Sequence, residues 1–130
     1  MAEIIGIGGV FFKARDGAAL REWYTRVLGL EIADWGGVVF TPEMAAKKPG
    51  AATVWSSFAA DSDYFAPSAR GFMINFMVDD LDAMLARCKT HGVEPVKIFG
   101  DEANGRFAHI MGPEDLKIEL WEPKPMPSSA

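Results

Sequence analysis

Cysteine and histidine are scarce in this chain of 130 residues, which contains one cysteine, Cys88, and two histidines. A single thiol cannot form a disulfide within the chain, and proteins without disulfides are typical of reducing compartments. Long apolar runs are also missing, since no stretch reaches the roughly 18 residues that a membrane span needs. The opening MAEIIGIGG lacks the basic region and apolar core of a secretory signal peptide. We therefore expect a cytoplasmic protein that does not contact a membrane.

Positive charge is in short supply as well. The chain has 13 Lys and Arg against 18 Asp and Glu, which gives a net charge of −5, and its basic residues are scattered. Nucleic acids and anionic membranes are bound by clustered positive charge, so neither is an expected partner. Apolar residues make up 49% of the chain, enough for a hydrophobic core. The length allows one domain, or two half-size modules that share a core.

Two helices are indicated by apolar residues at helical spacing. Each follows an aspartate whose carboxylate can accept a free backbone N–H of the first turn, and each ends before a glycine that tolerates a positive φ. The first set is Asp16, residues 18–28 and Gly29, and the second is Asp79 or Asp80, residues 81–91 and Gly92.

Alternation of side chains predicts strands in both halves of the chain. The expected strands are residues 4–14, about 30–34, 37–41, 53–58, 72–78, 94–99, and a hairpin over residues 105–123. Residues 44–51, with Pro49 and Gly50, are expected to form a loop.

The two halves form an internal repeat. Gly9 and Trp55 are 46 residues apart, and so are Met73 and Glu119, while both helices begin at matching offsets. The sequence therefore predicts two copies of strand–helix–strand–strand–strand. We expect an α+β fold in which two βαβββ modules form a curved half-barrel of mixed sheet, with the helices outside and a cleft inside. The predicted division is residues 1–58, a linker over 59–71, residues 72–123, and a flexible tail over 124–130.

The two faces of the predicted strands differ in character. One face is aliphatic and aromatic and suits packing under the helices; it consists of Val10, Phe12, Ile74, Phe76, Val78, Ile118 and Leu120. The other mixes large apolar residues with a few polar ones, as the walls of ligand pockets do. Its predicted ligand-binding residues are Phe11, Trp55, Met73, Asn75, Phe107 and Trp121.

His109 and Glu119 are the strongest candidates for chemistry. Each lies five residues from Glu114, so a hairpin centred there places them opposite one another, about 4.5–5.5 Å apart at Cβ. A carboxylate beside an imidazole fixes its tautomer and orients it as a general base. The alternative is a structural pair that only satisfies two polar groups, as many buried pairs do.

Three segments carry a resemblance to a known family: REWYTRVLGLEI, FMVDDLDAMLARCKTHGVEP and GPEDLKIELWEP. With the paired modules, they resemble the vicinal oxygen chelate superfamily, which includes glyoxalase I, bleomycin-resistance proteins and extradiol dioxygenases. The resemblance covers about residues 5–123. It implies the fold more strongly than the function, because the superfamily supports many chemistries.

The resemblance also implies where a divalent ion would bind, at the positions of Gly9, Trp55, Met73 and Glu119. Only Glu119 offers a hard oxygen donor there, and one carboxylate does not retain such an ion against water. We therefore expect no metal and no other cofactor.

Two functions remain open on the sequence. The first is a metal-independent protein of the bleomycin-resistance type that binds a small apolar or aromatic molecule in the cleft. The second is a lyase or isomerase of the glyoxalase type, with His109 as base and Glu119 as its orienting partner. The resemblance implies a homodimer, which would cover open sheet edges. Tyr64 and Phe65, in the linker, either cover the cleft or belong to the dimer contact.

Overall fold

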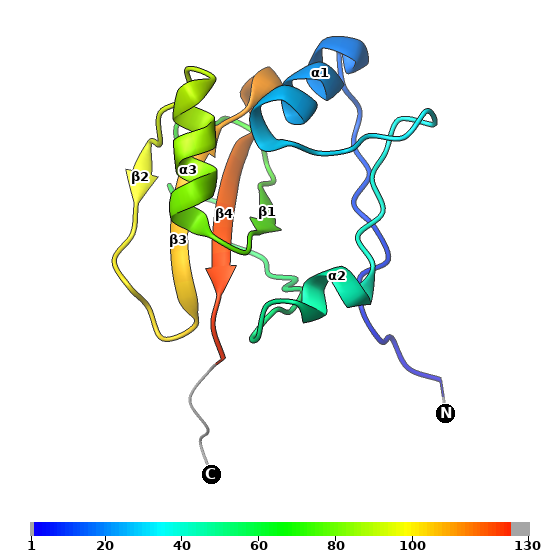
Figure 1. Cartoon of the computed structure of the whole chain (residues 1–130), viewed down its shortest axis with the longest axis vertical. Helices are drawn as coiled ribbons and strands as arrows, with labels where there is room; N and C mark the ends of the chain where they lie inside the picture. Colours follow the sequence, from blue (N-terminus) through cyan, green and yellow to red (C-terminus); the bar gives the residue numbers. More distant parts are fainter. Residues whose placement is uncertain (1, 126–130) are drawn as a thin grey trace.

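The computed structural model describes residues 2–125 (Figure 1). The elements in chain order are α1 (Gly17–Leu28), α2 (Pro42–Ala46), β1 (Ile74–Met77), α3 (Leu81–Thr90), β2 (Lys97–Ile98), β3 (Gly105–Met111), a 3₁₀ turn η1 (Pro113–Asp115) and β4 (Lys117–Pro123). Of the predicted flexible tail, residues 126–130 lie outside the described part of the chain. Within it, no helix has the length and apolar character needed to cross a membrane.

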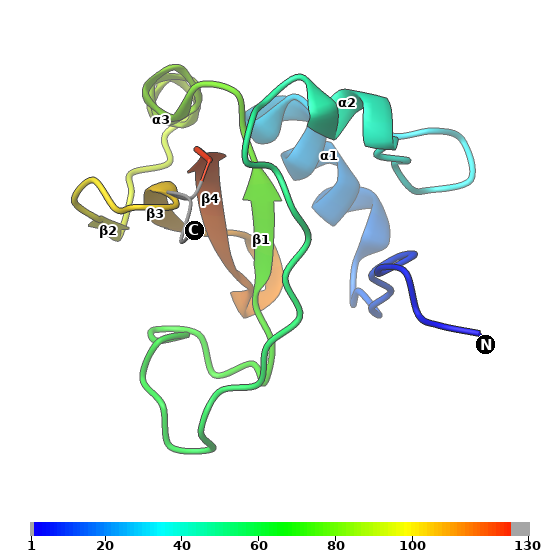
Figure 2. The same cartoon turned by 90° about the horizontal axis from the view of Figure 1, so that it is seen from below.

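The fold is α+β and is built on one open, mixed sheet. Its four strands lie in the order β1-β4-β3-β2, with β1 parallel to β4 and the other neighbours antiparallel. Helices α1 and α3 lie on one side of this sheet, while the loop that joins the two halves lies on the other (Figure 2). The sheet therefore has a face under the helices and an opposite face, which we call the outer face.

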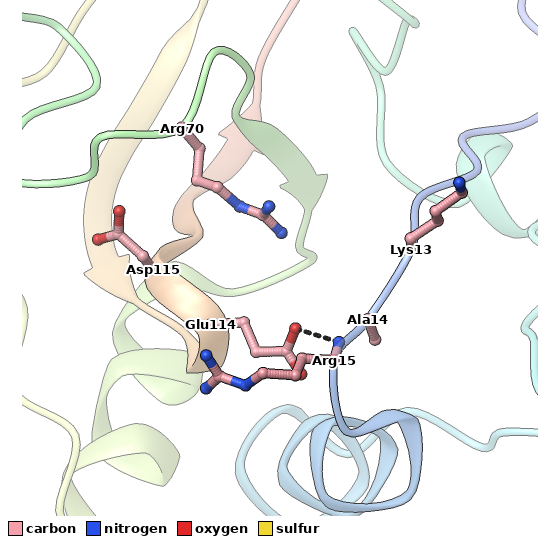
Figure 3. A pocket seen from close by; sticks show the side chains of 6 residues that line it. All are labelled: Lys13, Ala14, Arg15, Arg70, Glu114 and Asp115. Atoms are coloured by element: carbon pink, nitrogen blue, oxygen red, sulfur yellow. Dashed lines mark hydrogen bonds between the residues drawn. The ribbon is translucent and has the colours of Figure 1, made fainter.

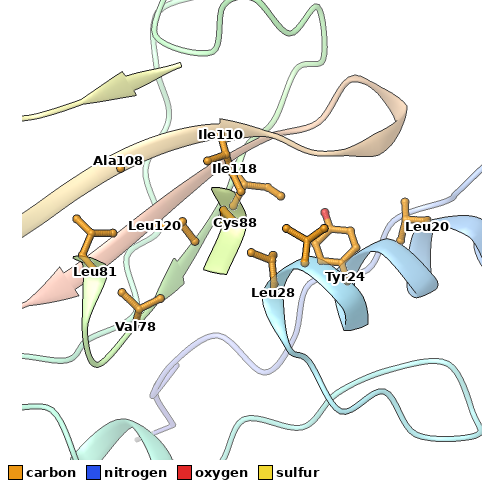
Figure 4. Close-up of a cluster of buried hydrophobic side chains, with 11 residues drawn as sticks. Leu20, Tyr24, Leu28, Val78, Leu81, Cys88, Ala108, Ile110, Ile118 and Leu120 are labelled. Carbon is orange, nitrogen blue, oxygen red and sulfur yellow. The ribbon is translucent and has the colours of Figure 1, made fainter. Parts of the chain in front are cut away.

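The core lies between the two longer helices and the sheet (Figure 4). Because side chains alternate along a strand, every second residue of β3 and β4 points at the helices. The buried cluster consists of Leu20, Tyr24, Val27, Leu28, Val78, Leu81, Cys88, Ala108, Ile110, Ile118 and Leu120. The prediction that Val78, Ile118 and Leu120 pack under the helices is confirmed.

The ends of the helices follow the sequence signals. Asp16 and Asp80 each accept a hydrogen bond from the backbone N–H three residues later, at 3.1 and 3.0 Å. Gly29 ends α1 with φ of 75°, in the left-handed region that favours glycine. Arg87 of α3 donates to the final carbonyls of α1, with its Nε 3.0 Å from the oxygen of Val27. This contact joins the two helices at the negative end of the α1 dipole.

The hairpin formed by β3 and β4 has the predicted register, with His109 opposite Glu119. Its turn places Glu114 and Asp115 at φ of 60° and 61°. The Glu114 carboxylate accepts hydrogen bonds from the backbone N–H groups of Arg15 and Asp16, at 2.7 and 2.9 Å. The tip of the hairpin is therefore attached to the start of α1.

The strands predicted in the first half are not formed in the single chain. Residues 4–14, 30–34, 37–41 and 53–58 contain no hydrogen-bonded strand, although the Gly36–Gly37 turn is present. Val10 and Phe12, predicted under the helices, are 59% and 39% exposed. A strand needs a neighbour to accept and donate its backbone hydrogen bonds. Between these segments the described residues make only one such bond, from the N–H of Ala33 to the carbonyl of Gly37 at 3.0 Å. The division into modules therefore stays a prediction.

The expected loop at residues 44–51 is wrong in its first part, where α2 forms. Thr41 caps this helix, since its Oγ1 accepts a hydrogen bond from the N–H of Met44 at 3.3 Å. Pro42 follows at the first helical position, where its missing N–H costs nothing. A threonine followed by proline was thus a helix signal that the loop prediction overlooked.

Candidate functional site

The candidate site lies on the outer face of the sheet. His109 and Phe107 project there from β3, while Lys117, Glu119 and Trp121 project from the neighbouring strand β4. The residues between them face the helices. The same alternation that builds the core therefore also gathers polar and aromatic side chains on the opposite side.

His109 and Glu119 form a buried pair. The Nε2 atom of His109 is 2.8 Å from Oε2 of Glu119, and the two residues are 1% and 8% exposed. Glu119 also accepts hydrogen bonds from Asn75 Nδ2, at 2.8 Å, and from the hydroxyl of Tyr64. The Nδ1 atom of His109 is buried and has no hydrogen-bond partner among residues 2–125. Both oxygens of the carboxylate thus accept hydrogen bonds, and one imidazole nitrogen is free.

The surroundings set the charge of this network. Burial raises the pKa of Glu119, but the hydrogen bonds from His109, Tyr64 and Asn75 outweigh it, so the pKa lies below its ordinary value. Burial, together with the hydrogen bond and charge of Glu119, raises the pKa of Tyr64. Glu119 is therefore the ionised acceptor of the group, and Tyr64 is a neutral donor.

Lys117 holds the linker against the outer face. Its Nζ donates to the backbone carbonyls of Tyr64 and Ala66, both at 2.8 Å. Burial and the nearby charge of Lys97 lower the pKa of Lys117. Lys117 is only 5% exposed, so its ammonium group has lost most of its contact with water. The two carbonyls supply the hydrogen bonds that water would otherwise make.

Aromatic rings continue across the outer face from the buried pair. Phe107 stacks on Trp121 with ring centroids 5.8 Å apart and planes 3° apart. Phe99 lies between Phe107, at 6.4 Å, and His109, at 4.8 Å. A row of rings next to a buried carboxylate suits a flat, apolar molecule that carries one polar group.

The structure brings together some of the predicted site residues but not all. Asn75, Phe107, His109, Glu119 and Trp121 share the outer face, and Met73 is half-buried just before β1. Two predicted wall residues lie elsewhere. Phe11 is 92% exposed and Trp55 is 82% exposed, because the strands expected to carry them are not formed.

Sequence reasoning missed most of the role of Tyr64, and it missed Phe99. The alternation of residues 94–99 was a usable signal for Phe99. Lys97 pairs with His109, so the side chain of Phe99, two residues further along, lies on the same outer face. Tyr64 had no comparable signal, since it lies in a segment without strand or helix periodicity. Of the two roles considered for it, the structure has Tyr64 covering the outer face.

The residues at the expected metal positions do not fit a divalent ion. Gly9 has no side chain, Trp55 cannot ligate, and the thioether of Met73 is a poor donor for hard ions. Glu119, the remaining position, already accepts hydrogen bonds from three protein groups. Within the described residues, no three His, Cys, Asp or Glu side chains gather as a metal site.

A separate hollow of about 560 Å³ opens beside the hairpin turn (Figure 3). It is lined by Lys13, Ala14, Arg15, Arg70, Glu114 and Asp115. Its two carboxylates already accept backbone N–H groups, that of Glu114 from Arg15 and that of Asp115 from Ala69. None of the predicted site residues lines this hollow, so it is distinct from the outer face.

Three solved structures are similar to this chain. TnmS3 of Streptomyces sp. CB03234, described as an antibiotic binding protein, matches with a TM-score of 0.54 and 18% identity over 95% of this chain and 100% of its own. A glyoxalase/bleomycin resistance protein from Catenulispora acidiphila matches with a TM-score of 0.45 and 22% identity, over 82% of this chain and 88% of its own. A glyoxalase family protein from Bacillus cereus matches with a TM-score of 0.45 and 21% identity, over 95% of this chain and 97% of its own.

No curated protein matches the sequence significantly. A family model, in contrast, matches residues 6–120, which is most of the chain. The resemblance noted in the sequence is thereby confirmed, together with the α+β fold that it implied. The chain belongs to the Glyoxalase/Bleomycin resistance protein/Dioxygenase superfamily.

Proposed function

We propose that this chain is a metal-independent binding protein for a small aromatic or apolar molecule. The observation that carries the proposal is the row of rings on the outer face, Phe99, Phe107 and Trp121, which ends at the buried pair of His109 and Glu119. Stacking and apolar burial supply affinity without a metal. The likeness in fold to an antibiotic binding protein is consistent with a ligand of this kind.

The ionised carboxylate gives the site its polar contact. Glu119 can accept a hydroxyl or N–H group of a ligand, and its depressed pKa keeps it charged at neutral pH. No divalent ion takes part in the proposed binding, because a single carboxylate that already accepts three hydrogen bonds is a poor substitute for a set of metal ligands.

We further propose that the protein functions as a homodimer. Many large apolar residues of the first half are more than half exposed: Ile4, Ile5, Val10, Phe11, Trp35, Val39, Phe40, Val54 and Trp55. Exposure of this extent is uncommon in a monomer. Backbone groups of residues 2–14 and 52–58 make no backbone hydrogen bonds within the described chain. A second copy brings identical unpaired segments, so a two-fold contact can satisfy both.

A second candidate function is favoured by one observation, the free Nδ1 of His109 beside the His109–Glu119 contact of 2.8 Å. With Nε2 held by the carboxylate, Nδ1 can take a proton from carbon next to a carbonyl. The proton then resides on the imidazolium and the electron pair on the resulting enolate. This is the first step of a lyase or isomerase.

The binding proposal predicts that 8-anilinonaphthalene-1-sulfonate binds on the outer face and fluoresces there. Trp121→Leu should raise the dissociation constant of the dye about three- to tenfold, because a stacked ring pair is lost. Trp35→Leu is a control for the loss of an indole ring elsewhere, since Trp35 is 70% exposed at the Gly36–Gly37 turn whereas Trp121 is 7% exposed. Equal affinity for both variants in a fluorescence titration contradicts the proposed site.

Because Glu119 is ionised, Glu119→Gln should lower the free energy of unfolding by an amount that depends on pH. Because the folded state lowers its pKa from the ordinary value of about 4.5, the stabilisation is complete above that pH and is lost as the pH falls below it. At neutral pH the variant should lose about 1–3 kcal/mol of unfolding free energy. The difference from wild type should shrink on acidification.

Urea unfolding measured from neutral to acidic pH checks this expectation, with Glu94→Gln as the baseline, because Glu94 is exposed. A loss for Glu119→Gln that stays constant as the pH falls through 4.5 is incompatible with an ionised Glu119 held by its three donors.

The dimer proposal predicts a particle of twice the 14.2 kDa chain mass in sedimentation velocity. Phe11→Asp with Trp55→Asp should shift it to monomer, since both side chains are exposed in the single chain and their loss does not disturb its core. Met44→Asp, at another exposed apolar residue, should leave the dimer intact. A monomeric wild type would sink the proposal.

The general-base alternative predicts exchange of the carbon-bound hydrogens of hydroxyacetone in deuterated water, followed by NMR. His109→Gln should reduce the catalysed exchange at least about hundredfold, the usual range for loss of a general base. If wild type does not exceed the uncatalysed rate, or the variant retains the full rate, His109 is not a base.

A further inference from the structure

Tyr64 makes the contacts that a bound ligand would make. Its hydroxyl donates to Oε2 of Glu119, and its ring meets His109 edge-on, with centroids 5.0 Å apart and planes at 84°. Phe58 stacks on the same ring at 5.1 Å, and Phe99 lies 6.3 Å from it. The phenol of Tyr64 therefore has a polar anchor at one end and aromatic neighbours around its body.

The segment that carries Tyr64 is held to the sheet by few contacts. Residues 59–71 contain no helix or strand. Its hydrogen bonds to the rest of the described chain, besides that of the Tyr64 hydroxyl, are the two carbonyls held by Lys117 and the bonds from Ser68 and Ala69 to Asp115. The Lys117 ammonium also lies 5.7 Å from the centre of the Tyr64 ring. Phe58, which backs the Tyr64 ring, is itself 47% exposed. Neither Tyr64 nor Phe58 belongs to the core under the helices, so displacement of the ring leaves that core in place.

Access to the buried pair depends on this departure. His109 is 1% exposed and Glu119 is 8% exposed while Tyr64 is in place. A ligand that reaches Glu119 must therefore take over the position of the Tyr64 phenol. The chemistry of that position then describes the ligand.

We propose that Tyr64 is an internal stand-in for the ligand, and that the ligand is a hydroxylated aromatic whose phenolic hydroxyl replaces that of Tyr64 on Glu119. This inference rests on the proposed function and adds the ligand class to it. A ring without a hydroxyl would displace Tyr64 but leave the buried carboxylate with one donor fewer. Because an unsatisfied buried acceptor is costly, such a ring should bind about tenfold or more weakly.

Competition with Tyr64 also sets the affinity. The site is open only in the fraction of molecules from which the Tyr64 ring is absent, and the apparent affinity falls by that fraction. Removing the internal phenol should therefore strengthen binding, which is the opposite of what removal of an ordinary contact residue does.

The experiment uses p-cresol and toluene, which correspond to the side chains of tyrosine and phenylalanine. Their dissociation constants are measured by NMR titration of amide resonances around His109 and Glu119. Tyr64→Ala should bind p-cresol at least about tenfold more tightly than wild type. Tyr64→Phe keeps the ring but frees one acceptor site on Glu119, so its affinity for p-cresol should lie between those of wild type and Tyr64→Ala. In Tyr64→Ala, p-cresol should bind at least about tenfold more tightly than toluene.

Tyr24→Phe is the matched control, because its buried hydroxyl has no hydrogen-bond partner among the described residues and lies in the helix-side core. This variant should bind p-cresol as wild type does. Adding Glu119→Gln to Tyr64→Ala should reduce the preference for p-cresol over toluene, since a neutral amide oxygen is a weaker acceptor than the carboxylate. Should Tyr64→Ala fail to fold, the gain expected of Tyr64→Phe carries the test.

The outcomes separate the inference from the proposed function. If Tyr64→Ala binds p-cresol no more tightly than wild type, Tyr64 is a structural plug and the inference is wrong. Equal binding of p-cresol and toluene also overturns it, while leaving an apolar binding site in place. If the folded Tyr64→Ala binds neither, and wild type also fails to bind 8-anilinonaphthalene-1-sulfonate, the proposed function itself is wrong.

Discussion

The burial of the Glu119 carboxylate is the constraint on which the outer face depends. A buried charge is tolerated only when hydrogen-bond donors replace its lost water. Here the donors come from three separate segments: Asn75 from β1, His109 from β3, and Tyr64 from the linker. Because Glu119 lies on β4, between β1 and β3, its hydrogen bonds link both neighbouring strands and the linker. One side chain thus couples the sheet to the segment that covers it.

The second half of the chain was predictable because its signals are local. Asp80 and Gly92 mark the two ends of a helix within a short span, and a period of two separates the faces of β3 and β4. The pairing of His109 with Glu119 followed from counting outward from Glu114, since a hairpin turn fixes the register of both strands. The best candidate site was found in the sequence for this reason.

The first half and the cover of the site were not predictable in the same way. Alternation around Phe11 and Trp55 shows that a segment suits a strand, but a strand forms only where a neighbour exists, and alternation does not name that neighbour. Tyr64 posed a different difficulty. A loop residue acquires its role from where the loop is held, here through Lys117 and Asp115, and neither contact leaves a periodic pattern in the sequence.

A site closed by its own chain reconciles two opposing physical requirements. A carboxylate kept ready for a ligand must be ionised and shielded from water, yet an ionised carboxylate without donors destabilises the fold. Tyr64 supplies a donor in the structure, and in the proposed mode of binding the ligand hydroxyl takes its place, so the charge is satisfied in either state. The proposed arrangement costs affinity, since every ligand must first displace the phenol. A binding protein arranged in this way distinguishes ligands by their chemistry as well as by their shape. Only a ligand that donates a hydrogen bond to Glu119 offsets the free energy lost when the Tyr64 phenol is displaced.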